Sequence, residues 1–142
     1  MKANKTILCL LVACLSLHLF GCDRGPALQF VEGTVTLDGK PCANCVISFM
    51  PKDGGELGFA RTDEEGKYRL SSHVGKTRAG TTIGTYGICL DKRTVDPAVH
   101  PKASPDNPVQ LLPKKYTDGA TSGFEITVEK GKNVHDFDMF SK

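Results

Sequence analysis

The chain has 142 residues, which leaves room for one domain with a modest core. Of its 18 Lys and Arg residues, Lys2 and Lys5 lie in an N-terminal leader, and the 16 that remain equal the 16 Asp and Glu residues. No basic stripe is present, so we expect no nucleic-acid partner, and 15 Gly, 8 Pro and no Trp favour an all-β domain rich in turns.

The first 21 residues have the pattern of an export signal. Residues 1–6 contain two lysines and no acidic residue, and Ile7–Phe20 is an apolar run. This run is shorter than the roughly 20 residues that a membrane-spanning helix needs, and polar residues follow it. We therefore predict a signal peptide over residues 1–21, in preference to a retained membrane anchor.

The end of this leader carries a processing motif. Leu19–Cys22 resembles a lipobox, the pattern at which bacterial lipoproteins are acylated on cysteine and cleaved just before it. Phe20 departs from the pattern, since a smaller residue is usual there. We predict cleavage between Gly21 and Cys22 and lipidation of Cys22. The alternative is that Cys22 is an ordinary residue near a conventional cleavage site.

This interpretation divides the chain into three parts. Residues 1–21 are the lipoprotein signal peptide, residues 22–29 are a lipid-anchored tether, and residues 30–142 form one β-sandwich domain. The lipid on Cys22 would hold the domain close to a membrane. We expect the chain at the cell membrane or the outer membrane, with its domain facing the periplasm or the exterior.

Three cysteines remain outside the leader and the lipidation site: Cys42, Cys45 and Cys89. In an oxidising compartment they can form at most one internal disulfide, and the sequence leaves the pairing open. Cys42–Cys45 is a CxxC motif, but a redox-active CxxC normally opens a helix, and this one follows a turn and leads into a strand. A zinc site would need further ligands, such as Cys89 and a histidine. We favour a structural disulfide or buried thiols over redox or zinc chemistry.

Short alternating runs separated by Gly, Asp and Pro turns predict the domain's secondary structure. No run outside the leader has a helical period. We expect hairpins at residues 58–71, around the turn Asp63–Gly66, and at residues 123–140. The predicted strands are residues 30–37, 46–50, 58–62, 67–71, 82–91, 123–129 and 133–140.

Alternation within these strands also predicts the core. His135 occupies an apolar position on its strand, so we interpret it as a core histidine in preference to a ligand. The other residues expected on inner faces are Val31, Val35, Ile47, Phe49, Tyr86, Ile88, Leu90, Phe124, Ile126, Val128, Phe137 and Met139.

One stretch interrupts the series of strands. Residues 92–115 contain five prolines, and a connection of this length is unusual in a compact domain. It is either a functional loop or a variable insert, and we favour the insert.

These elements resemble carboxypeptidase-regulatory-like domains, which have a transthyretin-like fold. The likeness to the opening of such domains lies in Val31–Pro41 and Ile47–Pro51, and Thr62–Tyr68 and Gly84–Tyr86 match the elements that follow. The resemblance implies a single seven-stranded Greek-key β-sandwich.

The C-terminal part is similar to a narrower group, short bacterial envelope lipoproteins built on this one domain. That likeness lies in Leu112–Tyr116, Thr121–Gly123 and Asn133–Met139. The chain departs from such domains at Cys42 and Cys45, where small or aliphatic residues are usual, and at Gly87 and His135. Any role of the two thiols would therefore be particular to this protein.

The motifs of common enzyme classes are absent from the sequence: it contains no HExxH, no GxSxG and no Gly-rich phosphate loop. We therefore expect no catalytic residue, no metal and no cofactor, and a non-catalytic structural or protein-interaction module with an unidentified envelope protein as partner. One alternative is a module that binds carbohydrate or a metal such as calcium near Asp63–Glu65. The other is a thiol/disulfide or zinc lipoprotein that uses Cys42 and Cys45.

Overall fold

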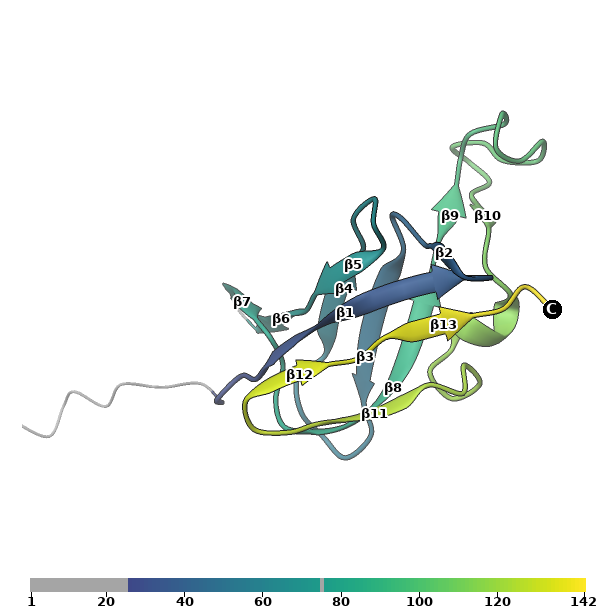
Figure 1. The fold of residues 1–142 in the computed structure, drawn as a ribbon. Helices are drawn as coiled ribbons and strands as arrows, with labels where there is room; N and C mark the ends of the chain where they lie inside the picture. The colour runs from purple at the N-terminus through teal and green to yellow at the C-terminus, as the bar shows by residue number, and fades with distance from the viewer. Residues whose placement is uncertain (1–25, 75) are drawn as a thin grey trace, which may run out of the picture.

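Two β-sheets pack face to face across one apolar core in the computed structural model, which describes residues 26–74 and 76–142 (Figure 1). The six-stranded sheet has the order β11-β8-β3-β4-β6-β7. Its strands are β3 (Val46–Pro51), β4 (Gly58–Arg61), β6 (Ser71–Val74), β7 (Lys76–Ala79), β8 (Gly84–Asp91) and β11 (Glu125–Val128).

The smaller sheet is centred on β1 (Phe30–Leu37). On one side β1 pairs in parallel with β12 (Lys132–Val134) and then with β13 (Phe137–Met139). On the other side it pairs antiparallel with β5 (Lys67–Arg69) and β2 (Lys40–Pro41). The chain therefore forms an all-β, sandwich-like fold, as the alternation predicted.

The core is built by the residues that the alternation assigned to inner faces. Val31, Val35, Ile47, Phe49, Tyr86, Ile88, Leu90, Val128 and Met139 are fully buried, and Phe137 is nearly so. Phe124 and Ile126 pack against this cluster from partly buried positions. Each large apolar side chain buried in this way contributes about 1.5–3 kcal/mol.

The predicted hairpin over residues 58–71 is wrong in its pairing, although its turn is present. Asp63 accepts the backbone N–H of Lys67 on its carboxylate at 2.8 Å, and Gly66 has a φ of +74°. However, β4 pairs with β3 and β6, whereas β5 pairs with β1 in the other sheet. The turn thus crosses between the sheets. Alternation indicates which face of a strand is buried but not which strand lies beside it.

The predicted C-terminal hairpin is wrong for the same reason. β11 pairs antiparallel with β8 in the larger sheet, and the chain then crosses to the smaller sheet. There β12 and β13 lie parallel to β1, with a break at His135 and Asp136. The smaller sheet thus combines parallel and antiparallel pairs, and four of its strands are only two or three residues long.

The Pro-rich stretch contains a short ribbon and one helical turn. β9 (Arg93–Thr94) pairs with β10 (Val109–Gln110), and the loop between them projects away from the sheets (Figure 1). A 3₁₀ turn, η2 (Lys114–Thr117), then packs against β8. Leu112 and Tyr116 are buried in the core, so the C-terminal end of this stretch belongs to the folded domain.

Candidate functional site

The predicted processing site, Gly21 and Cys22, lies outside the described residues. The described chain begins at Pro26, and Gln29 forms an isolated bridge with Thr81 immediately before β1. No helix within residues 26–74 and 76–142 has both the length and the hydropathy needed to cross a membrane.

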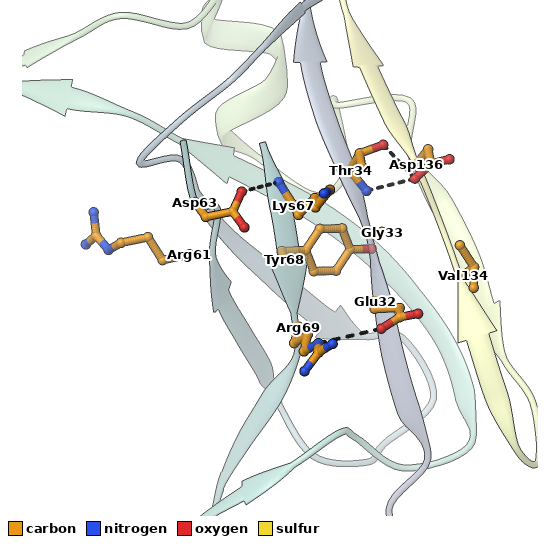
Figure 2. Close-up of a pocket in the computed structure, with 10 residues that line it drawn as sticks. All are labelled: Glu32, Gly33, Thr34, Arg61, Asp63, Lys67, Tyr68, Arg69, Val134 and Asp136. Atoms are coloured by element: carbon orange, nitrogen blue, oxygen red, sulfur yellow. Dashed lines mark hydrogen bonds and ion pairs between the residues drawn. The ribbon is translucent and has the colours of Figure 1, made fainter. Parts of the chain in front are cut away.

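An open hollow of about 820 Å³ lies on the outer face of the smaller sheet (Figure 2). The side chains of Glu32 and Thr34 reach it because they alternate along β1 with the buried Val31 and Val35. Its charged side chains are of both signs: Arg61, Lys67 and Arg69 against Glu32, Asp63 and Asp136. The surface is therefore suited to a charged or strongly polar ligand.

Glu32 connects three strands across this hollow. Its carboxylate lies 2.7 Å from Lys132 Nζ on β12 and 3.7 Å from Arg69 Nε on β5. The hydrogen bond from Lys132, together with the charges of Lys132 and Arg69, lowers the pKa of Glu32 below its ordinary value. The strands on both sides of β1 are thus linked through one ionised carboxylate.

Between the end of β12 and the start of β13, the Asp136 side chain takes the place of a backbone hydrogen-bond acceptor for β1. Its Oδ1 accepts both the backbone N–H and the hydroxyl of Thr34, each at 2.7 Å. Asp138 repeats the contact one step along, accepting the Thr36 hydroxyl at 2.6 Å. Alternation with the buried Phe137 and Met139 indicates only that these aspartates face outward. Their partners on β1 depend on a parallel register between the two ends of the chain.

Tyr68 and Gly33 stabilise the break between β12 and β13 from the core side. The Tyr68 hydroxyl donates a hydrogen bond to the backbone oxygen of His135 at 2.7 Å, and in Figure 2 the ring lies against β1 at Gly33. A Cβ added at Gly33 would lie 1.8 Å from that same oxygen, so only glycine fits. Burial raises the pKa of Tyr68 well above its usual range.

His135 is half-buried, and its Nε2 has no hydrogen-bond partner within the described chain. Burial lowers its pKa, opposed by the neighbouring Asp136 carboxylate. Among the residues that the structure describes, no three His, Cys, Asp or Glu side chains come together as a metal-binding group. The described residues therefore do not assemble the zinc or calcium ligand sets considered from the sequence.

The second candidate site is the turn Cys42–Cys45, between β2 and β3. Both cysteines are free thiols, 3% and 0% exposed, and belong to the main core cluster. Asn44 has a φ of +56°, the left-handed conformation that closes such a turn. The motif leads into β3, as the sequence predicted, and itself forms a turn between two strands.

Thr62 fixes both ends of this turn, a role that sequence reasoning missed. Its hydroxyl donates to the backbone oxygen of Cys42 at 2.6 Å and accepts the backbone N–H of Cys45 at 2.8 Å. The Thr62 N–H donates in turn to the Cys45 oxygen at 2.9 Å. No local pattern indicates this contact, because Thr62 lies 17 residues beyond Cys45.

The two thiols of the turn differ in acidity. The hydrogen bond from Cys45 lowers the pKa of Cys42 to about 7, and the charge of Lys92 adds to this effect. The same contact with Cys42, together with burial, raises the pKa of Cys45 far above its usual range. Cys42 is therefore the thiol that ionises first.

Cys89 lies elsewhere. On β8 it alternates with the buried Ile88 and Leu90, so its side chain points to the outer face of the larger sheet. Its thiol donates to the backbone oxygen of Thr117 on η2 at 2.7 Å. Burial raises its pKa, with the Asp118 and Asp91 carboxylates contributing.

Comparison with known proteins gave no family model, no curated protein and no solved structure that matches this chain.

Proposed function

We propose that this chain is a non-catalytic lipoprotein, anchored to a membrane through Cys22, whose domain binds another envelope protein. The observation that carries the binding role is the charged hollow on the outer face of the smaller sheet. The anchoring role follows from the lipobox-like sequence Leu19–Cys22. The two parts are independent and are tested separately.

The charges of the hollow favour a polypeptide partner with acidic side chains. Glu32 and Asp136 are already engaged within the domain. Lys67 and Arg61 are exposed and, among the described residues, form no ion pair. Exposed cations beside engaged carboxylates offer charge complementarity and specificity for acidic groups.

Carbohydrate binding has less support. Sugar sites generally use exposed aromatic faces. All three tyrosines are buried: Tyr68 is 3% exposed, Tyr86 is 0% exposed and Tyr116 is 4% exposed. Phe30 and Phe140 are the large aromatic side chains exposed within the described chain, and neither lines the hollow.

Site-specific photo-crosslinking tests the binding role. A photoreactive residue replaces Lys67 in the full-length chain, expressed with its own leader, and a matched control replaces Thr127, which is exposed on β11. We expect one dominant protein adduct from position 67 and none from position 127. The double change Arg61→Glu and Arg69→Glu should abolish that adduct. Equal adducts at both positions, or none at position 67, would contradict the proposal.

Fractionation and intact mass test the anchor. Protein from membranes should begin at Cys22 and carry added acyl mass, and Cys22→Ser should move the chain to the soluble fraction. An unacylated chain would remove the anchoring role and leave the crosslinking result standing by itself.

A further inference from the structure

We propose that Cys42 and Cys45 form the intramolecular disulfide of this chain, by exchange with an external disulfide, and that Cys89 stays a thiol. This inference does not depend on lipidation or on the charged hollow. It assigns a covalent modification site and its chemical partner, a protein or low-molecular-weight disulfide.

The backbone of the turn suits this bond. Cys42 and Cys45 are the first and last residues of a four-residue turn, whose end Cα atoms lie within about 7 Å of each other. Disulfides bridge Cα atoms that are roughly 4.4–6.8 Å apart. Thr62 holds the carbonyl of the first cysteine and the N–H of the last through one hydroxyl, so both positions are fixed before any bond forms.

Further contacts make the turn rigid. The Cys42 N–H donates to the Val35 oxygen at 2.9 Å, and the Asn44 N–H donates to the Thr62 oxygen at 3.2 Å. Gly66 packs so closely against the start of the turn that a Cβ there would lie 2.6 Å from the Val35 oxygen and 3.2 Å from the Cys42 nitrogen. The strands on both sides therefore hold the two cysteines together without their sulfurs being joined.

Cys89 is excluded as a partner by its direction. Cys42 and Cys45 lie in the core between the sheets, whereas Cys89 points to the outer face of β8. The chain would have to turn β8 over to bring the sulfurs together, which would expose Ile88 and Leu90.

The reaction proceeds in two exchanges. The Cys42 thiolate attacks one sulfur of the external disulfide, forms a mixed disulfide and releases one thiolate. Cys45 then loses its proton to that thiolate or to solvent and attacks the Cys42 sulfur, which releases the second thiolate. Two cysteine thiols are oxidised and one external disulfide is reduced to two thiols.

The first exchange requires that the external disulfide reach the Cys42 sulfur. Both thiols are buried, but the turn itself carries the exposed Asn44 and follows the exposed Lys40 and Pro41. Attack by Cys42 therefore requires local opening of this surface turn. Both sulfurs are thiols in the described structure, and the nucleophile and the resolving thiol lie at the two ends of one turn.

Differential alkylation of the full-length chain tests the proposal. The folded protein is incubated with oxidised glutathione, its free thiols are blocked under denaturing conditions, and the protein is then reduced, labelled a second time and digested with trypsin. Cys42 and Cys45 fall on one tryptic peptide, Gly25–Lys52, and Cys89 falls on another. We expect the second label on both cysteines of the first peptide and the first label on Cys89.

Single variants distinguish an attacking pair from two independent thiols. Cys45→Ala should stop the reaction at a glutathione adduct on Cys42. Cys42→Ala should slow the modification of Cys45, because Cys45 is fully buried and then has no neighbouring mixed disulfide to attack. Cys89→Ser is the matched control and should leave the oxidation of the pair unchanged.

Two results would overturn the assignment. One is a disulfide that contains Cys89. The other is wild-type Cys42 and Cys45 that stay reduced, or carry glutathione separately, after the protein has been unfolded and refolded in the presence of the oxidant. An intact mass taken before reduction shows added glutathione if the two cysteines are modified separately and none if they are joined, and neither this mass nor the wild-type map requires a variant to fold.

Discussion

Thr62 is a single side chain on which the geometry of a whole turn depends. It is 2% exposed, and its hydroxyl stands in the place of the direct hydrogen bond that would close the turn Cys42–Cys45. A buried hydroxyl with both a donor and an acceptor role is costly to remove, because two backbone groups then lose their partner at once.

We therefore expect Thr62→Val, which keeps the shape and removes the hydroxyl, to lower the free energy of unfolding by about 1–3 kcal/mol. Thr62→Ser keeps the hydroxyl and is the control, with a loss below about 1 kcal/mol. Urea unfolding under reducing conditions measures both. Equal losses in the two variants would show that packing of the methyl group, and not the hydroxyl, holds the turn.

Glu32 gives the stability of the smaller sheet a dependence on pH. Lys132 and Arg69 lower its pKa in the folded chain below the ordinary value of 4.5. A lowered carboxyl pKa contributes stability above the unfolded pKa, and that stability is lost as the pH falls through the folded pKa. The loss therefore lies on the acidic side of about pH 5.

Glu32→Gln removes the charge and should remove this dependence. We expect the wild type to have the higher urea midpoint near neutral pH and the difference to shrink as the pH falls below about 4. At roughly 1 M salt the difference should shrink at neutral pH as well, because the Glu32 side chain is 24% exposed and its two partners are more exposed still. A gap that is the same at every pH would contradict the ion-pair explanation.

At the scale of elements, alternation predicted correctly which face of each strand is buried, but it did not predict which strands pair. The strands of Val31, Phe49 and Tyr86 were found because their inner residues recur every second position, which is a local property. The two predicted hairpins failed because a short turn can equally well lead into the opposite sheet. The close approach of Gly33 to the His135 oxygen, which accompanies the crossing, depends on residues about a hundred positions apart.

The same limit applies to the candidate sites. The CxxC motif is visible in the sequence because both thiols lie within four residues. Its positioning residue, Thr62, is not visible, nor are the partners of Asp136 in the charged hollow. Both depend on the register between strands that are distant in sequence. This register is set by packing of the whole core and not by any local signal.

Shortening the projecting loop between β9 and β10 tests whether the Pro-rich stretch is an insert. Val95 and Val99 are exposed on it, and Asp96 and Asn107 bond within the loop itself. A long loop costs more chain entropy to close than a short one. Replacing residues 95–108 by Asn-Gly should therefore change the free energy of unfolding by less than about 1 kcal/mol or increase it.

Leu112→Ala is the matched control, because Leu112 lies in the same Pro-rich stretch but is 5% exposed in the core. It should cost about 2–5 kcal/mol. Thermal unfolding of both variants separates the two cases. If shortening the loop destabilises the domain as much as Leu112→Ala, the loop is part of the fold and the insert hypothesis is wrong.

At the scale of the whole molecule, one cluster of rings joins the two sheets. The ring centroid of Phe49, on the larger sheet, lies 6.2 Å from that of Tyr68 and 6.1 Å from that of Phe137, both on the smaller sheet. It lies 6.0 Å from the ring centroid of Tyr86 on its own sheet. Neither sheet can bury its inner face alone, so the two should unfold together. Cooperative loss of both sheets is therefore expected when this ring is removed.

Phe49→Ala should lower the free energy of unfolding by about 3–5 kcal/mol while the transition stays single. Met50, the next residue, is 46% exposed on the opposite face, and Met50→Ala should cost less than about 1 kcal/mol. Far-ultraviolet circular dichroism reports on the strands of both sheets, and tyrosine fluorescence reports on the packing around the three buried tyrosines, in one titration. Coincident curves indicate one cooperative unit, because the probes then lose their signal at the same denaturant concentration. Two separated transitions would show that the sheets are stable independently, and the ring cluster would then be a contact between units and not the centre of one core.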